Sequence, residues 1–248
     1  WIGCTKVSPA CDGCYAEALM DKRYGRAQWG APGKGAGTRV RTSAGNWRLP
    51  MRWNAQASET SVSPFVFCSS LADVFDNQVP AEWRRDLFEL ILKTPRLVWL
   101  LLTKRPQNIV RLVGEVGYLP TNVALGATIE DQRRADANLL HLDQARRCLP
   151  ALFTFASCEP LLGPIVIPPA LMPDWIITGG ETDQGGHRAR PSNPQWFRDL
   201  RDQCAASGVA FHHKQNGEYL DLQRVGKARS GRLLDGVEHD ARPEVAAR

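Results

Sequence analysis

Leu97-Val98-Trp99-Leu100-Leu101-Leu102 is an unbroken apolar run, and the polar turn Thr103-Lys104-Arg105-Pro106 follows it directly. A strand with one wet face alternates apolar and polar residues, whereas a strand covered on both faces of a parallel sheet does not. This run therefore predicts a buried strand in a parallel sheet. Similar short strands are expected near Trp1–Gly3 and at Phe65–Cys68, Val123–Thr128, Leu152–Ala156, Trp175–Thr178 and Val209–His213.

Amphipathic segments separate these strands, and their apolar residues recur at helical spacing. The expected helices cover Ala81 to Lys93, Gln107 to Val113, Asp131 to Arg146, and a segment that begins with Asn193 as cap and Pro194 as first helical residue. Repeated strand–helix units with buried strands are typical of an α/β fold with a parallel sheet, either open or closed into a barrel.

The domain organisation follows from length and composition. A chain of 248 residues with 43% hydrophobic content can form one sizeable core. We expect one α/β domain over residues 1–216, a basic insertion rich in Gly and Trp at about 25–63, and an irregular tail over 217–248. Since the chain begins with Trp rather than Met, we expect residues to precede it. No apolar run approaches the ~18 residues of a membrane span, and seven cysteines, an odd number, favour the reducing cytoplasm.

The net charge of +5 is concentrated in the insertion. Between residues 22 and 58 there are eight basic residues and no acidic ones, interleaved with three tryptophans. Basic and aromatic side chains together suit phosphate contact and base stacking. The other interpretation is a solvated segment whose tryptophans cover the edge of the core. The candidate nucleic-acid contacts are Arg39, Arg41, Trp47 and Arg48.

Cys4, Cys11 and Cys14 form a C-x6-C-x2-C motif at the start of the chain. Three thiolates suit a soft metal or an iron–sulfur cluster. A disulfide would leave one thiol unpaired, and a structural zinc site would need a fourth ligand from a distant part of the chain. The spacing alone leaves open an iron–sulfur cluster, a zinc site with a remote ligand, and unligated thiols.

Polar residues stand where each expected strand ends. Because the carboxyl ends of parallel strands gather on one face, these residues are expected to form a polar rim around the cysteines. For any one of them a helix cap or turn is the alternative explanation. The rim comprises Ser69-Ser70-Leu71-Ala72-Asp73, Thr103 to Pro106, Thr128-Ile129-Glu130, Ser157-Cys158-Glu159-Pro160, Gly179-Gly180-Glu181 and Lys214-Gln215.

Several motifs, in this order along the chain, resemble the phage and prophage three-cysteine family related to radical S-adenosylmethionine (radical SAM) enzymes. They are Trp1 to Pro9, Cys11-Asp12-Gly13-Cys14-Tyr15-Ala16-Glu17, Leu102 to Pro106, Ser157 to Pro164, Gly179-Gly180-Glu181 and Lys214-Gln215. The resemblance extends from residue 1 to about residue 240.

The resemblance implies a partial (β/α) barrel of about six parallel strands and a four-iron four-sulfur (4Fe-4S) cluster on Cys4, Cys11 and Cys14. The open iron would chelate S-adenosylmethionine, and an electron from a donor such as flavodoxin or ferredoxin would cleave it. The 5′-deoxyadenosyl radical so released would abstract a substrate hydrogen. The six-residue gap after Cys4 departs from the commoner C-x3-C-x2-C spacing of such enzymes.

Roles for the polar rim follow from its chemistry and are hypotheses. The expected S-adenosylmethionine contacts are Ser69, Ser70, Thr128, Glu130, Gly179, Gly180 and Glu181. Arg105, Lys214 and Gln215 are expected to hold the substrate, and the expected catalytic residues are Lys104, Cys158 and Glu159. A thiol at position 158 could return a hydrogen atom to a product radical, although a buried cysteine also serves as a small core residue.

Three classes of function remain. The leading one is a radical SAM enzyme that rearranges a modified thymine base or nucleotide in phage DNA, in the host cytoplasm. The second is the same chemistry on a substrate other than nucleic acid. The third is a zinc-stabilised nucleic-acid-binding protein without catalysis.

Overall fold

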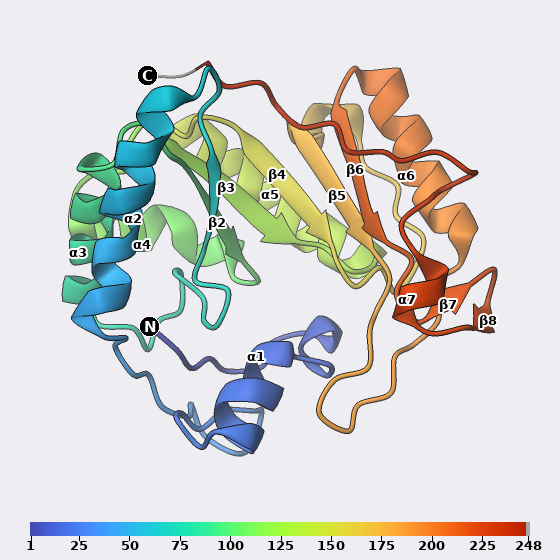
Figure 1. The fold of residues 1–248 in the computed structure, drawn as a ribbon, viewed down its shortest axis with the longest axis horizontal. Helices are drawn as coiled ribbons and strands as arrows, with labels where there is room; N and C mark the ends of the chain where they lie inside the picture. The colour runs from blue at the N-terminus through green and yellow to red at the C-terminus, as the bar shows by residue number, and fades with distance from the viewer. Residues whose placement is uncertain (247–248) are drawn as a thin grey trace.

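The computed structural model describes residues 1–246, and its centre is a six-stranded parallel sheet in the order β1-β2-β3-β4-β5-β6. Each strand pairs with the next one along the chain, and the sheet curls into a half-barrel (Figure 1). The predicted α/β fold with about six parallel strands is confirmed. The strands are β1 (Phe65–Cys68), β2 (Val98–Thr103), β3 (Val123–Thr128), β4 (Thr154–Cys158), β5 (Trp175–Gly179) and β6 (Ala210–Gln215).

Helices cover the outer face of the half-barrel (Figure 1). The main helices between the strands are α3 (Ala81–Leu92), α4 (Ile109–Val116), α5 (Gln132–Cys148) and α6 (Pro194–Ser207). Asn193 caps α6 as predicted, because its side chain accepts a hydrogen bond from the backbone N–H of Gln195 at 2.9 Å. Shorter helical segments are η1 (Pro9–Cys11), α1 (Tyr15–Glu17), the π-helical η2 (Ala18–Arg23), η3 (Ala57–Glu59), η4 (Pro106–Asn108) and η5 (Pro169–Leu171).

Strand side chains divide between two apolar clusters because neighbouring residues point to opposite faces. Trp99 and Leu101 of β2 belong to the main core beneath the helices, whereas Val98 and Leu100 belong to a smaller cluster with Phe155. The smaller cluster lies on the concave face. Both faces of the sheet are therefore buried, which explains the unbroken apolar runs.

The start of the chain is not a strand of the sheet, contrary to the prediction for Trp1–Gly3. Ile2 forms only an isolated bridge with Val40, through backbone hydrogen bonds of 2.9 and 3.0 Å. This pairing attaches the N-terminus to the insertion instead of to β1.

The basic insertion contains a helix that the sequence analysis missed, α2 (Ala44–Gln56), which begins at the cap residue Ser43. Pro50 inside the helix and the lack of an apolar stripe hid it. Trp47 packs against Trp1, with ring centroids 6.5 Å apart. The interpretation of the tryptophans as cover for the core edge is therefore correct for Trp47.

The C-terminal segment is more ordered than predicted. It forms a hairpin of β7 (Tyr219–Leu220) and β8 (Gln223–Arg224), followed by α7 (Lys227–Ser230). The chain then runs across the amino ends of the strands (Figure 1). The indole N–H of Trp175 donates to the carbonyl of Ala241 at 2.9 Å, and the N–H of Ser63 donates to that of Val245 at 3.3 Å. The segment thus joins β5 to the residues before β1.

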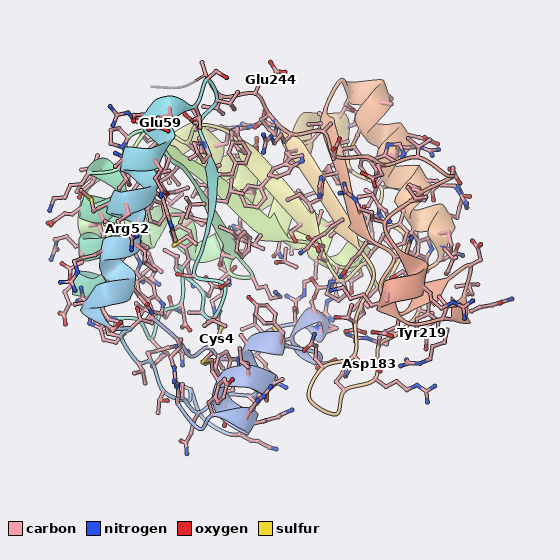
Figure 2. The ribbon with its side chains drawn as sticks, in the orientation of Figure 1. Cys4, Arg52, Glu59, Asp183, Tyr219 and Glu244 are labelled. Carbon is pink, nitrogen blue, oxygen red and sulfur yellow. The ribbon has the colours of Figure 1, made fainter. Side chains whose placement is uncertain are left out.

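The two ends of the half-barrel are different. Figure 2 shows Cys4 and Asp183 at the end toward which the strands run, and Glu59 and Glu244 at the other. The C-terminal segment closes the amino ends of the strands, which leaves their carboxyl ends facing the cysteine motif. Among residues 1–246 no helix is both long and apolar enough to cross a bilayer.

Candidate functional site at the carboxyl ends of the strands

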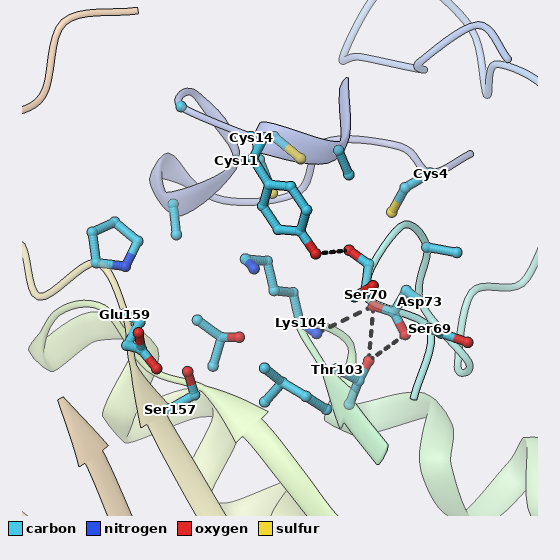
Figure 3. Close-up of a pocket in the computed structure, with 18 of the residues that line it drawn as sticks. Cys4, Cys11, Cys14, Ser69, Ser70, Asp73, Thr103, Lys104, Ser157 and Glu159 are labelled. Atoms are coloured by element: carbon cyan, nitrogen blue, oxygen red, sulfur yellow. Dashed lines mark hydrogen bonds between the residues drawn. The ribbon is translucent and has the colours of Figure 1, made fainter. Parts of the chain in front are cut away.

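A cavity of about 470 Å³ lies between the cysteine motif and the carboxyl ends of the strands (Figure 3). Its volume is within the range of small-molecule and cofactor sites. The wall combines thiols, strand-end polar groups and aromatic rings. From the predicted set it includes Cys4, Cys11, Cys14, Ser69, Ser70, Lys104, Arg105, Thr128, Glu159, Gly180, Glu181, Lys214 and Gln215.

The three predicted metal ligands line this cavity together (Figure 3). Cys11 ends η1 and Cys14 caps α1, so one short turn carries both thiols. The thiol of Cys4 lies 3.5 Å from Nη1 of Arg105. Burial raises the pKa of Cys4 to about 11 and also raises that of Cys14. The unligated thiols of Cys4 and Cys14 are therefore protonated at neutral pH, and a metal would have to displace their protons.

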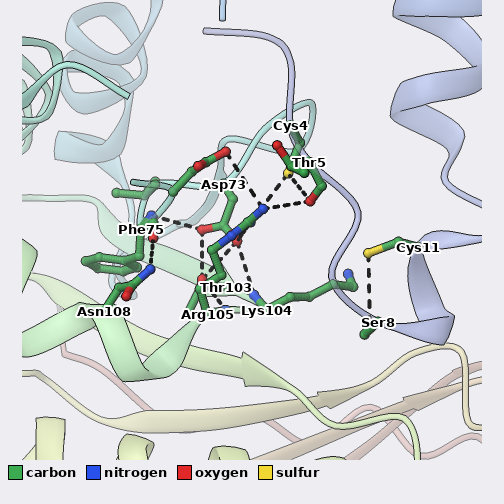
Figure 4. Close-up of polar contacts among 12 residues, drawn as sticks. Cys4, Thr5, Ser8, Cys11, Asp73, Phe75, Thr103, Lys104, Arg105 and Asn108 are labelled. Carbon is green, nitrogen blue, oxygen red and sulfur yellow. Dashed lines mark hydrogen bonds and ion pairs between the residues drawn. The ribbon is translucent and has the colours of Figure 1, made fainter. Parts of the chain in front are cut away.

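These donors fit an iron–sulfur cluster in type and charge. Within the described part of the chain, no group of three or more His, Cys, Asp or Glu side chains is close enough to hold a single metal ion. A four-iron cluster does not require such convergence, because each thiolate binds a different iron atom. Burial alone would lower the pKa of Lys104, but the negative charges around it, those of ionised Cys11 and Cys14 first and then Glu130 and Asp73, together outweigh burial and raise this pKa. Lys104, which extends toward Cys11, would thus stabilise ligated thiolates (Figure 4).

Asp73 organises the end of β2 beneath the cysteines (Figure 4). Its carboxylate accepts hydrogen bonds from the hydroxyl of Thr103 at 2.7 Å, the N–H of Lys104 at 3.2 Å and Nη1 of Arg105 at 2.9 Å. Burial alone would lower the pKa of Arg105, but Asp73, Cys4 and Asp76 together outweigh it and raise this pKa. Nη2 of Arg105 donates to the carbonyl of Thr5, so Arg105 is committed to the protein and is not the free substrate contact that was predicted.

Two buried polar atoms beneath the motif have no partner among residues 1–246: Oγ1 of Thr128 and Oε2 of Glu130. The other oxygen of Glu130 accepts a hydrogen bond from the N–H of Ala10 at 3.3 Å. Buried polar groups are nearly always paired. Thr128 lines the cavity, so its hydroxyl is a candidate for contact with a bound molecule, whereas Glu130 is buried and is not part of the cavity wall.

Cys158 does not face the cavity, so the prediction that it is a catalytic thiol is wrong. The cavity wall contains Ser157 and Glu159, and the residue between them points to the opposite face of β4. Its side chain is fully buried in the main core, where burial and then the neighbouring Cys204 hold its pKa well above the ordinary value. Cys158 is a small core residue.

The two glycines at the end of β5, Gly179 and Gly180, serve close packing within the protein. A Cβ atom on Gly180 would lie 2.0 Å from the carbonyl oxygen of Asn216, and one on Gly179 would lie 2.9 Å from Oε2 of Glu159. Glu159 in turn pairs with Lys214 at 2.9 Å, and the side chain of Lys214 is 58% exposed. This pair stands at the rim, where Lys214 is accessible to a substrate.

Glu181 is already occupied by protein groups. Arg190 donates to both of its oxygens, at 2.6 and 2.8 Å, and Nε2 of His187 lies 3.2 Å away. Burial alone would raise the pKa of Glu181, but the Arg190 hydrogen bonds outweigh it and lower this pKa. The predicted contact to a cofactor amino group would have to compete with this pair. The sequence analysis missed Arg190, which lies in an irregular loop without any periodic signal.

The predicted nucleic-acid contacts differ in accessibility. Arg39 forms a buried ion pair with Asp76, and its side chain is 4% exposed, so its prediction as a nucleic-acid contact is wrong. Arg41 pairs with Asp86 at 2.7 Å and lies over the ring of Trp47, whereas Arg48 is exposed. The basic charge that remains accessible is thus smaller than the sequence indicates.

Comparison with known proteins bears on the family and not on the activity. No curated protein and no protein of solved structure matches the chain. One family model matches residues 1–243, and its description is "protein of unknown function (DUF5131)". Because this match covers nearly the entire chain, the protein belongs to the DUF5131 family.

Proposed function

We propose that this protein is a radical SAM enzyme that carries a 4Fe-4S cluster on Cys4, Cys11 and Cys14. The observation that carries the proposal is that these three thiols and the carboxyl ends of the parallel strands line one cavity. In parallel α/β folds this edge of the sheet holds the active site. Such a cluster supplies the electron that cleaves S-adenosylmethionine reductively, with flavodoxin or ferredoxin as the proposed external donor.

The side chains of the cavity would then bind and orient the reactants. Lys104 and Arg105 place positive charge beside the thiolates. The hydroxyl of Thr128, which lines the cavity, can donate a hydrogen bond to S-adenosylmethionine or accept one from it. Buried Glu130 would instead hold the cysteine segment through the N–H of Ala10. Lys214 offers a cation at the rim for a phosphate or carboxylate.

The proposed substrate is a modified thymine base or nucleotide in DNA, which the enzyme would rearrange. Support comes from aromatic rings in the cavity wall that remain accessible: Phe67 is 50% exposed and Tyr15 is 46% exposed. Exposed aromatic faces stack on bases irrespective of sequence. The exposed Arg48 on α2 adds a cation suited to a phosphate backbone.

The test is anaerobic reconstitution with iron and sulfide, followed by incubation with dithionite and S-adenosylmethionine. We expect absorbance near ~400 nm from the cluster and formation of 5′-deoxyadenosine. Cys11→Ala should remove both signals. Cys148→Ala, which removes an exposed cysteine of α5, is the matched control and should retain them. Cofactor cleavage by the Cys11 variant would refute the ligand assignment, and a colourless protein with stoichiometric zinc would refute the enzyme.

A further inference from the structure

The backbone from Cys4 to Val7 is extended and has only one paired edge, and η1 begins two residues later at Pro9. On that edge Gly30 of the insertion donates to the carbonyl of Cys4 at 2.9 Å and accepts from the N–H of Lys6 at 3.0 Å. Because backbone groups alternate along an extended segment, the carbonyls of Thr5 and Val7 face the other way and need other partners. The carbonyl of Pro9 accepts from the N–H of Asp12 at 3.1 Å and can accept a second hydrogen bond.

Three arginines supply those partners. Nη2 of Arg105 donates to the carbonyl of Thr5 at 2.6 Å, Nη2 of Arg134 to that of Val7 at 2.8 Å, and Nη2 of Arg190 to that of Pro9 at 2.9 Å. The three come from separate places in the fold: the end of β2, the first turn of α5 and the loop after β5. The three carbonyls they reach are two residues apart along the segment.

A carboxylate lies beside each guanidinium. Arg105 is held by Asp73 at 2.9 Å and Arg190 by both oxygens of Glu181. Nε of Arg134 lies 4.0 Å from Glu130, whose carboxylate also accepts from the N–H of Ala10 in the same segment. A guanidinium has five donors in a rigid fork, so it can bind a carboxylate and a carbonyl at once. Lysine could not replace it in this arrangement.

We propose that Arg105, Arg134 and Arg190 form a clamp that fixes the cysteine segment before any metal binds. The clamp spans the six residues between Cys4 and Cys11, which gives a physical reason for that long gap. Fixing a loop in advance removes its conformational entropy from the cost of binding. The arginines are positioning residues, and the purpose of the clamp rests on the proposed function, although the clamp itself does not.

Thiol alkylation of the metal-free protein tests the clamp without a cluster. Arg190 is the best target because it contacts Asp12, Pro9 and Glu181 and no cysteine, and exposed Arg188 in the same loop is the matched control. In Arg190→Gln, iodoacetamide should alkylate Cys11 and Cys14 about tenfold faster, as expected for loss of a charge-assisted hydrogen bond. Arg188→Gln should match wild type. Removing a cation raises thiol pKa and slows alkylation, so acceleration cannot arise from charge.

Cys204 reports on global unfolding, because it lies on the buried face of α6 and far along the chain from the motif. Its alkylation rate should stay at the wild-type value in Arg190→Gln and in a second variant, Arg134→Gln. Unchanged rates at Cys11 and Cys14 in both variants, or equal acceleration at Cys204, would overturn the clamp. Absence of iron from reconstituted wild type would instead overturn the proposed function and leave the alkylation result standing.

Discussion

Acidification from pH 7 to pH 5 is expected to destabilise the protein through one fully buried side chain, His213 of β6. Its Nδ1 lies 2.9 Å from the hydroxyl of Thr178 and its Nε2 lies 3.1 Å from Oδ1 of Asn216. The amide nitrogen of Asn216 donates to the carbonyls of Ser230 and Leu233, so its oxygen must face the histidine. Nε2 therefore carries a hydrogen, and in the neutral ring Nδ1 accepts from the hydroxyl of Thr178.

Burial lowers the pKa of His213 to about 4, whereas an unfolded histidine titrates near ~6.5. Above the unfolded value neither state binds the proton, so this residue adds no pH dependence. As the pH falls below that value, the unfolded state gains a proton that the folded state excludes, and the free energy of unfolding decreases. By pH 4 this residue has lowered the free energy of unfolding by roughly 3 kcal/mol relative to alkaline pH. About 2 kcal/mol of that decrease occurs between pH 7 and pH 5.

Urea unfolding followed by circular dichroism at pH 7, 6 and 5 measures this effect. His213→Gln should be less stable than wild type at pH 7, but the gap should narrow by about 2 kcal/mol at pH 5, because the variant has no imidazole to protonate. His141→Gln on α5 controls for loss of a histidine elsewhere and should follow wild type. A gap between wild type and His213→Gln that does not change with pH would refute the assignment of a neutral buried ring.

Three further predictions concern the site and its surroundings. Gly180→Ala would place Cβ 2.0 Å from the carbonyl oxygen of Asn216. We therefore expect the free energy of unfolding to fall by about 2 kcal/mol or more, and an unchanged melting temperature would contradict that close approach. Cys158→Ala should lower stability by about 1 kcal/mol without slowing cofactor cleavage; slower cleavage at full stability would restore a catalytic role. The double variant Arg41→Gln, Arg48→Gln should bind DNA with a shallower slope of log affinity against log salt concentration, by about one for each lost phosphate contact. Unaltered binding would remove the argument for a nucleic-acid substrate.

The sequence by itself determined the sheet and the location of the site. The strand Val123–Thr128 was predicted with the bounds that the structure has, because an unbroken apolar run between turns reflects burial on both faces. Polar residues at the strand ends and the three cysteines were expected to meet, and they line one cavity. Periodicity and chain order suffice for these inferences, since parallel strands place their carboxyl ends on a common edge.

Only the tertiary structure decided which of those polar groups are free. Adjacent residues such as Ser157 and Cys158 differ in function because the sheet presents one to the cavity and the other to the core. Arg134 reaches Val7 across 127 positions of sequence, and Arg39 is neutralised by Asp76 across 37. Pairing of this kind depends on side chains brought together by folding, and no local pattern of residues records it.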